Sequence, residues 1–466
     1  MEKNTNRRIN YLTIILWTLA ILLVIPNLIR IFDNNFWGDE AFTIRLAKMT
    51  FSEMLSATAA DVHPPLYYWI VQMAYKIAGN NGVIYHLVSL IPYLLIMLLA
   101  LTVIRKWFSE TASVILMILC SLQENAVNFN VEVRMYSWGA LFLLLSFLAL
   151  YQILTLNSKR HYVYFVLASL ASAYTHYYCL VSVAFFYIIL ILWALIKRKD
   201  YFKRTLIACV ATVAGYLPWF LVLLQTFQRT MSDFWMTNIP YLKDCIGYFF
   251  SGRLQYVLFA IMMVAVVVYA WYQRKSTETL LWLAAGISSL FGTILVGNLV
   301  SRLFRPVFIV RYLYPVSIIA WFLLAIGIAG CKYKRIYTLV IVTVLLYVGI
   351  PPYIEVYQAE KAQDQLLQET LSATSMISGD NDVILTNLKH IDWTVAEYYY
   401  PDVDCELIDI ESLPILEQDK NYYLMLPTPA EPKIIDQLDD QGFSLEILVD
   451  QGTLGTNPVN IYQLKR

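Results

Sequence analysis

Long uninterrupted apolar runs constrain the fold of this 466-residue chain more than any other feature of its sequence. A helix needs about 18–20 apolar residues to cross the hydrocarbon core of a bilayer. Lipid accepts apolar side chains on every face of a helix, so such runs need no helical periodicity. Several runs approach or exceed that length: Leu12–Ile29, Val83–Ile104, Ala140–Leu156, Tyr178–Ile196, Val257–Trp271, Ile309–Ile328 and Tyr337–Ile350. We therefore predict a polytopic α-helical membrane protein.

The composition agrees with this prediction and says little about partners. Hydrophobic residues make up 59% of the chain and charged residues 15%, against about 45–50% and about 25% in soluble domains. The formal net charge is +0, so global charge points to no partner class, and no nucleic acid is expected. The six cysteines are scattered, and only Cys405 lies in the polar tail. Their spacing indicates neither a metal site nor a disulfide framework.

Short basic clusters indicate the orientation of the chain. Lys and Arg concentrate on the cytoplasmic side of membrane proteins, so passage out and back between successive clusters gives about ten spans. An eleventh span near Ile336–Tyr353 then places the C-terminal tail outside. The first apolar run is too long for a cleaved signal peptide, so we expect a retained anchor with a cytoplasmic N-terminus in the cytoplasmic membrane. The clusters are Arg7–Arg8, Arg105–Lys106, Lys159–Arg160, Lys197–Arg204, Arg274–Lys275 and Lys332–Arg335.

The longest of the expected external connections, Ile31–Gly82, has the signals of short helices. After a first amphipathic stretch, Thr50–Glu53 (TFSE) reads as a capping box that opens a second helix. A Pro-Pro pair suits the start of a third helix, Leu66–Ala78. We expect the first two helices to lie along the outer membrane surface and Tyr67–Trp69 to sit in the interfacial aromatic belt.

The composition becomes polar and acidic after Pro351-Pro352. We divide the chain into a transmembrane domain, residues 1–355, and a small extracytoplasmic α/β domain, residues 356–466. Short alternating segments in the second domain are typical of strands separated by helices. The expected strands are Asp382–Thr386, Cys405–Ile410, Asn421–Pro427, Phe443–Val449 and Val459–Leu464, and the expected helices are Asp392–Tyr400 and Glu431–Gln441.

Two pairs of ionisable residues lie within the external connection Ile31–Gly82. Asp39 and Glu40 follow the first apolar run, and Asp61 and His63 recur near the far end. Either pair alone reads as a solvated loop, because water is close to a helix end at the interface. Two surface helices could fold the pairs together. One carboxylate could then deprotonate a hydroxyl while another holds its partner or raises its pKa.

Arginines occur in the external connections, where the orientation rule disfavours them. Arg134 lies at the start of one span, and Arg302, Arg305 and Arg311 lie in a single short connection. A guanidinium at the level of the lipid headgroups suits a phosphate, although arginines at span ends also contact ordinary lipid phosphates. His176 in the turn YTHYY is by itself more typical of a hydrogen-bonded packing residue. Together the charges indicate one external pocket at the lipid boundary.

These residues carry a resemblance to a known family. Trp37–Ala41 (WGDEA) followed by Asp61–Tyr68 (DVHPPLYY) resembles the first external loop of GT-C membrane glycosyltransferases. The most similar branch is the bacterial one related to protein O-mannosyltransferases and the aminoarabinose transferase of lipid A. Arg134–Tyr136 (RMY), Thr175–Tyr178 (THYY) and Arg311–Pro315 (RYLYP) resemble further family motifs. The resemblance covers most of the chain from Ile9 to Pro352, and the tail is generic.

The resemblance implies a GT-C fold and inverting transfer of a sugar from a polyprenyl-phosphate donor to a hydroxyl acceptor. It implies that Asp39 takes the acceptor proton and that Glu40 and Asp61 shape the acceptor side. The acceptor class, whether protein, lipid or surface glycan, stays open. Some relatives use a divalent metal, and Asp39, Glu40, Asp61 and His63 could ligate one, which the sequence does not decide.

The resemblance also assigns the donor side. It implies that Arg134, Arg305 and Arg311 bind the donor phosphate. Tyr136, His176 and Tyr177 would line the same substrate site, and His63 could support a carboxylate or a metal. A lipid phosphate is a stable leaving anion, so cations that meet its developing charge should supply the main stabilisation.

Two other functions fit a polytopic chain. A transporter or lipid flippase has the same architecture, but transporters tend to carry ionisable groups near the midplane and internal repeats. Here the notable charges lie at the outer ends of the spans, and the sequence shows no repeat. A non-enzymatic anchor that presents the tail to a partner would leave the acidic and arginine clusters without a role.

Overall fold

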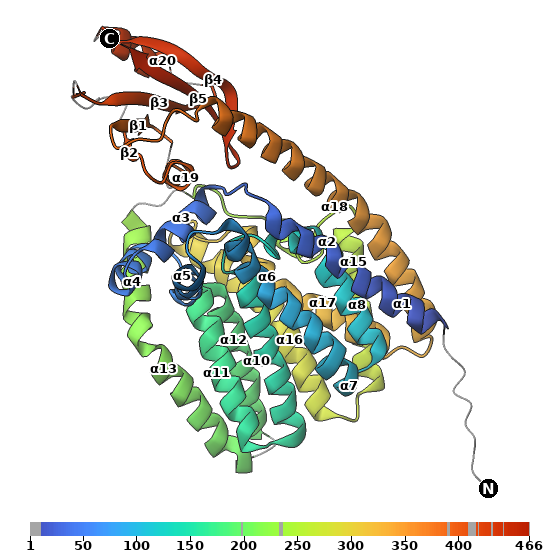
Figure 1. Cartoon of the computed structure of the whole chain (residues 1–466). Helices are drawn as coiled ribbons and strands as arrows, with labels where there is room; N and C mark the ends of the chain where they lie inside the picture. Colours follow the sequence, from blue (N-terminus) through green and yellow to red (C-terminus); the bar gives the residue numbers. More distant parts are fainter. Residues whose placement is uncertain are drawn as a thin grey trace.

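The computed structural model describes residues 11–196, 199–232, 236–388, 392–408, 416–417, 419–429, 432–440 and 442–465. A helical bundle forms the larger part, and a small sheet domain lies beyond one of its ends (Figure 1). The long helix α18 (Lys334–Ala373) runs from the bundle into the sheet domain. The proposed boundary at residues 355 and 356 falls inside this helix, and the division into two domains stays a prediction.

The bundle is built from the apolar runs of the sequence. Within the described residues, nine helical stretches are long and apolar enough to cross a membrane. The helices of the bundle are α1 (Tyr11–Leu22), α2 (Val24–Ile29), α6 (Gly82–Leu99), α7 (Arg105–Trp107), α8 (Glu110–Leu122), α10 (Tyr136–Leu156), α11 (Lys159–Thr175), α12 (Tyr177–Ile196), α13 (Lys199–Ser232), α15 (Gln255–Tyr272), α16 (Thr277–Leu303), α17 (Tyr314–Ala329) and α18.

Two shorter helices, α8 and α11, complete the set of predicted membrane spans. The rings of Tyr136 and His176 lie 5.8 Å apart, so α10 and α12 begin at the same end of the bundle. Helix α11 must therefore carry the chain back between them, and α8 does the same between α6 and α10. The count agrees with the predicted eleven spans, and the multi-pass helical fold is confirmed.

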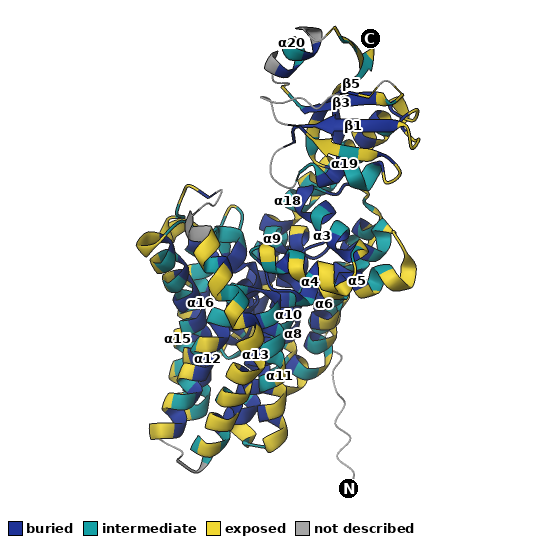
Figure 2. Ribbon diagram, turned by 90° about the vertical axis from the view of Figure 1, so that its left-hand side faces the viewer, coloured by how far each residue is buried: buried dark blue, intermediate teal, exposed yellow. Residues whose placement is uncertain are grey.

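The bundle is packed around α17. The most apolar part of the span that contains α17 is 94% buried inside the protein, against 22% for the span of α13. Aromatic rings fill the middle of the bundle, where Phe147 stacks on Trp282 at 4.5 Å and Phe322 packs edge-on against Trp282. Figure 2 shows exposed residues along the outer helices and buried residues between them, as expected for helices whose outer faces meet lipid.

Three helices at one end of the bundle form the connection that follows the first span. They are α3 (Gly38–Lys48), α4 (Phe51–Ala60) and α5 (Leu66–Ala78), and they lie between the bundle and the sheet domain (Figure 1). The predicted capping box is present, because Thr50 Oγ1 accepts a hydrogen bond from the Glu53 amide and Glu53 Oε2 accepts one from the Thr50 amide.

The prediction that Tyr67 and Tyr68 sit in the interfacial belt is wrong. Both side chains are fully buried, whereas Trp69 is 45% exposed. The Tyr67 hydroxyl pairs with Ser89 at 2.7 Å, so α5 packs its tyrosines against α6. That the helices lie along the membrane surface stays a prediction.

The C-terminal domain is a five-stranded mixed sheet in the order β2-β1-β3-β5-β4. Strands β1, β2 and β3 are parallel, and β5 is antiparallel to β3 and β4. Each predicted strand and helix has a counterpart, although residues 409–415, 430–431 and 441 lie outside the described part of the chain. The elements are β1 (Asp382–Thr386), α19 (Thr394–Tyr399), β2 (Asp404–Leu407), β3 (Asn421–Pro427), α20 (Pro432–Asp440), β4 (Ser444–Leu454) and β5 (Asn457–Lys465).

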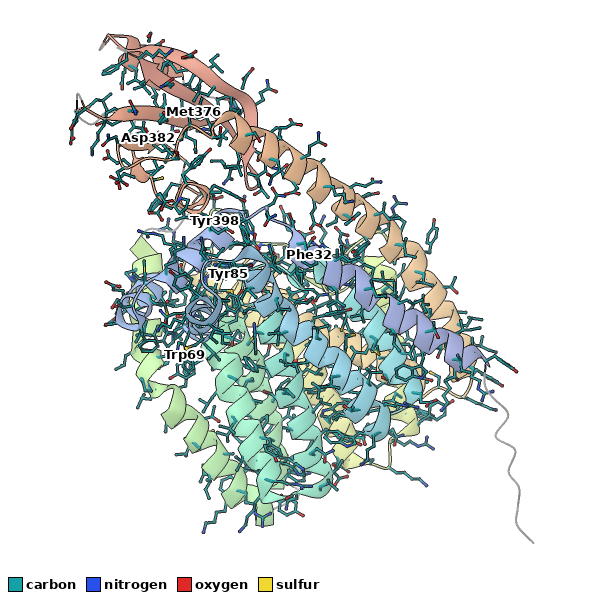
Figure 3. The ribbon with its side chains drawn as sticks, viewed as in Figure 1. Phe32, Trp69, Tyr85, Met376, Asp382 and Tyr398 are labelled. Atoms are coloured by element: carbon teal, nitrogen blue, oxygen red, sulfur yellow. The ribbon has the colours of Figure 1, made fainter. Side chains whose placement is uncertain are left out.

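The sheet domain contacts the bundle through α19. The ring of Tyr398 lies 4.7 Å from that of Phe36, and Figure 3 shows Tyr398 close to Tyr85 of α6. Arg45 of α3 forms an ion pair with Glu397 of α19 at 2.9 Å. The domain therefore rests on the same end of the bundle as α3.

Candidate active site

Asp39 lies at the start of α3, beside cations from two distant segments. Its Oδ2 atom is 3.4 Å from Arg311 Nη2 and 3.8 Å from Arg134 Nε. Arg311 is in the 3₁₀ turn η3 (Val310–Leu313), and Arg134 precedes α10. The partial positive charge at the start of a helix further favours a carboxylate there. The structure thus brings together the acidic connection and two of the predicted arginines.

Arg134 is buried within protein contacts. Its side chain is 2% exposed, and Nη1 donates to the Asp39 carbonyl and to Thr43 Oγ1, both at 3.2 Å. The same nitrogen is 3.4 Å from the Tyr68 hydroxyl. These bonds join α3, α5 and the segment before α10, so Arg134 holds the acidic connection in place.

Asp61 and His63 form a second pair next to Arg134. His63 Nδ1 is 3.2 Å from Asp61 Oδ2, and the Tyr68 hydroxyl donates to the same oxygen at 3.1 Å. Burial raises the pKa of Asp61, but the hydrogen bond from His63 and the nearby cations outweigh it and leave that pKa lowered. Burial lowers the pKa of His63 against the opposing effect of Asp61. Asp61 is therefore held as an anion.

Glu40 faces away from this cluster. Its Oε1 accepts a hydrogen bond from the Val133 amide at 2.6 Å, and its Oε2 accepts one from the Trp37 amide at 3.2 Å. Burial, with the charge of Glu132 nearby, raises the pKa of Glu40 well above its usual value. The Glu40 side chain ties α3 to the segment before α10.

His176 joins the cluster from the turn between α11 and α12. It is buried, and its Nδ1 accepts a hydrogen bond from the Tyr178 amide at 3.2 Å. Its ring is 5.8 Å from that of His63 and 5.1 Å from that of Tyr312. Burial, with His63 and the two arginines nearby, lowers the pKa of His176 well below 6.5. A neutral ring bonded in this way carries its hydrogen on Nε2, which has no partner among the described residues.

The other predicted donor-side residues lie at different distances from the cluster. Tyr136 is fully buried beside His176. The Tyr177 hydroxyl accepts a hydrogen bond from Trp219 Nε1 of α13 at 3.3 Å, so this side chain points toward α13. Arg305 is partly buried in the loop after α16, and none of the described contacts joins it to Asp39. Arg302 is exposed on α16.

An apolar cavity of about 350 Å³ ends at this cluster. Its walls come from α12, α13, α16 and the loop that follows α16, with Leu223, Val296 and Val300 among them. His63, His176 and Tyr312 form its polar end. Such a cavity suits a long apolar chain whose polar head reaches the two histidines.

The four residues named as possible metal ligands do not converge. Asp61 contacts His63, Asp39 faces arginines, and both Glu40 oxygens accept backbone hydrogen bonds. Within the described residues, no group of three or more His, Cys, Asp or Glu side chains is placed to hold an ion. The arrangement therefore does not fit one divalent metal on these four side chains.

Sequence analysis missed residues that complete the cluster. Tyr68 bridges Asp61 and Arg134, Tyr312 packs on His176, and the Arg311 guanidinium lies 5.5 Å from the centre of the Trp37 ring. Each stands within or next to a quoted motif. A signal was therefore present, but tyrosines and tryptophans near span ends more often serve as interfacial anchors.

Comparison with known proteins gives a family match. Residues 62–224 match the family model described as dolichyl-phosphate-mannose-protein mannosyltransferase. The match spans about a third of the chain, and it shows that this segment is similar to that family of membrane glycosyltransferases. The matched segment contains His63, Arg134, Tyr136, His176 and Tyr177. A comparison with curated proteins gave no match.

Solved structures show the same fold as this chain over nearly its whole length. ArnT from Cupriavidus metallidurans in the apo state has a TM-score of 0.62 at 10% identity, over 96% of this chain and 97% of that one. The same protein bound to undecaprenyl phosphate has a TM-score of 0.62 at 11% identity, over 98% of both chains. The predicted fold class, a polytopic GT-C bundle with a C-terminal α/β domain, is confirmed.

Proposed function

We propose that this glycosyltransferase moves a sugar from a polyprenyl-phosphate donor to a hydroxyl acceptor, with inversion, at the outer face of the cytoplasmic membrane. One observation carries the proposal: the apolar cavity between α12, α13 and α16 ends at His63, His176 and Tyr312. At that end His63 Nδ1 is 3.5 Å from Arg134 Nη2, and Arg134 lies beside Asp39 together with Arg311.

The donor side follows from the chemistry of the cavity. An isoprenoid chain would fill the apolar walls, and its phosphate would lie at the polar end. Arg311 is the better placed of the two arginines, because its side chain is 28% exposed whereas that of Arg134 is 2% exposed. His176 Nε2 supplies a further buried donor without a partner among the described residues. The relative that was solved with undecaprenyl phosphate supports this class of donor.

The reaction needs one base and no acid. The acceptor oxygen attacks the anomeric carbon, the bond from that carbon to the phosphate oxygen breaks, and its electron pair leaves with the phosphate. The acceptor proton goes to Asp39. One displacement inverts the anomeric configuration, and the leaving phosphate is already a stable anion, unlike the alkoxide in glycoside hydrolysis.

Arg311 links the two halves of this mechanism. In the structure its guanidinium is 3.4 Å from Asp39 Oδ2, so the two side chains form an ion pair when no donor is bound. A donor phosphate would compete for Arg311 and draw the guanidinium away from Asp39. Binding of the donor would thus leave the Asp39 carboxylate free to accept a hydrogen bond from the acceptor hydroxyl, and Arg311 would stabilise the charge that develops on the phosphate.

Helix direction supports the outer location of the site. Asp39, Arg134 and His176 lie at the end of the bundle where α10 and α12 begin. The basic residues Lys159, at the start of α11, and Arg274, after α15, lie at the opposite helix ends. By the positive-inside rule that end is cytoplasmic, so the site and the sheet domain are outside. Arg7–Arg8 lies outside the described residues.

The test is Asp39→Asn in the purified full-length protein, reconstituted with radiolabelled polyprenyl-phosphate sugars. Label should leave the organic phase with wild-type protein. It should do so at least a hundredfold more slowly with the variant, because a positioned base contributes about 10²–10⁴-fold. Glu110→Gln, in an exposed pair with Arg105 at the cytoplasmic end, is the control. Equal rates for wild type and Asp39→Asn would overturn the assigned base, and no transfer from any donor would overturn the function.

A further inference from the structure

A second cavity, of about 380 Å³, lies between the bundle and the sheet domain. Trp37 and Glu40, the residues that flank Gly38-Asp39, form one wall. The opposite wall comes from Val356, Glu360 and Gln363 on the extension of α18 that leads to the sheet domain. Nothing in the donor chemistry uses this space, although it adjoins the base along the chain.

The lining of this cavity is acidic. Asp33, Glu40, Glu132 and Glu360 all border it, against the single cation Arg30. That cation is already paired, because Arg30 Nε donates to Glu360 Oε2 at 3.0 Å. The cavity therefore offers no free cation among its described lining residues to pair with an anionic group.

Buried acceptor atoms without donors also line the cavity. They are Asn35 Oδ1, His86 Nε2 and Glu132 Oε1, each buried and without a hydrogen-bond partner among the described residues. Asn35 and His86 are 8% and 3% exposed. A buried polar atom left unpaired is unfavourable, so such atoms in a cavity indicate a missing partner.

The neighbouring hydrogen bonds fix the roles of two of these atoms. Asn35 Nδ2 donates to Asp33 Oδ1 at 2.9 Å, which leaves the amide oxygen Oδ1 as the unpaired atom. His86 Nδ1 is 2.8 Å from the Val131 carbonyl and must donate to it, so Nε2 of the neutral ring is an acceptor. The missing partner is therefore rich in N–H or O–H donors.

We propose that this cavity binds the acceptor and selects a polyhydroxylated group without anionic charge, namely a neutral or amino sugar. The inference rests on the proposed function and deepens it by naming the acceptor class. Hydroxyl and ammonium groups supply the donors that Asn35, His86 and Glu132 lack. A phosphate or carboxylate brings only acceptors and finds no free cation among the described lining residues. The bound sugar would lie on the side of α3 that Glu40 faces, away from the Asp39 carboxylate, so it would be a part of the acceptor other than the one that carries the reacting hydroxyl.

The test measures binding of three small probes to the full-length protein in lipid nanodiscs by saturation-transfer NMR. The probes are methyl β-glucoside, glucosamine and glucose 6-phosphate. We expect the first two to bind and the third to bind at least tenfold more weakly. At pH 8, above the raised pKa of Glu132, Glu132→Gln should weaken the binding of glucosamine and narrow the difference in affinity between glucosamine and glucose 6-phosphate, because it removes a negative charge. Glu110→Gln, at the opposite end of the bundle, should change neither.

A second variant provides an independent test in case Glu132→Gln does not fold. Asn35→Leu should weaken methyl β-glucoside at least fivefold while undecaprenyl phosphate binds as to wild type. Equal binding of all three probes, or binding that neither variant alters, would overturn the proposal. Undecaprenyl phosphate binding separates the two hypotheses. If the sugar probes bind in a way that depends on Glu132 but undecaprenyl phosphate does not bind, only the donor assignment is refuted. If undecaprenyl phosphate binds but the sugar probes show no dependence on Glu132, only the acceptor cavity is refuted.

Discussion

Replacement of Arg311 should separate donor binding from the integrity of the site. Its Nη2 is 3.4 Å from Asp39 Oδ2. At about 4 Å and an effective dielectric constant of about 20, one cation and one anion interact by roughly 4 kcal/mol. Arg311 is 28% exposed, and a phosphate must compete with Asp39 for it. Both facts reduce the net contribution to about 2–3 kcal/mol, which corresponds to a loss of roughly 30–150-fold in affinity.

The assay is equilibrium binding of undecaprenyl phosphate to purified full-length protein. Arg311→Ala should weaken binding by that factor, whereas Arg311→Lys should restore part of it, because a lysine keeps the charge without the bidentate geometry. Arg302→Ala is the matched control, since Arg302 is exposed on α16 close along the chain. Thermal unfolding of each variant confirms that the bundle is intact.

One result would refute the assignment of Arg311. If Arg311→Ala binds undecaprenyl phosphate as tightly as wild type while Arg305→Ala does not, the phosphate lies nearer the loop after α16. The donor would then not displace Arg311 from Asp39, and the proposed release of Asp39 by donor binding would be wrong.

Three further changes test the surroundings of the site. Tyr68→Phe removes a hydroxyl that donates to Asp61 at 3.1 Å and should reduce transfer about tenfold, since hydrogen bonds to charged groups contribute about 1.5–3 kcal/mol. Burial raises the pKa of Glu132 to about 7. The free energy of unfolding is therefore greatest at a pH below the pKa that Glu132 has in the unfolded chain, and it decreases as the pH rises through 7. Glu132→Gln should reduce this decrease, as measured by thermal unfolding from pH 5 to 8. Gly455→Ala should lower the unfolding midpoint far more than Gly442→Ala, since both have positive φ but only the first places a Cβ 1.8 Å from a backbone oxygen. Equal effects of the two glycine variants would contradict the docked position of the sheet domain.

Local signals in the sequence predicted the fold, because each depends on neighbouring residues. Lipid demands long apolar runs, a Thr-x-x-Glu pattern caps α4, and Pro-Pro precedes α5. These signals fixed the helices of the first connection closely. The burial of Tyr67 and Tyr68 could not be predicted in the same way, because it depends on the packing of α5 against α6. No local sequence pattern in α5 or α6 indicates that packing.

Only part of the candidate site could be predicted from the sequence, because the rest also depends on tertiary structure. Charge type and side of the membrane selected Asp39, Arg134 and Arg311, and the structure places these three together. The direction in which each side chain points is a tertiary property. Glu40 follows Asp39 directly, but one step along a helix turns a side chain by about 100°, and Glu40 consequently faces Val133 and the second cavity.

The distribution of polar groups also separates a transferase from a transporter. A transporter needs ionisable groups near the midplane and a route that can open to both sides. In the described bundle, aromatic packing around Trp282 fills the interior between Phe147 of α10 and Phe108 at the turn after α7, and the cluster of Asp39, Arg134 and Arg311 lies at the opposite end. Moving a charged headgroup past Trp282 would require this packing to separate and polar groups to enter an apolar core, which is costly. A reaction at one surface requires neither, because the donor can diffuse laterally within the bilayer and enter the apolar cavity from the side.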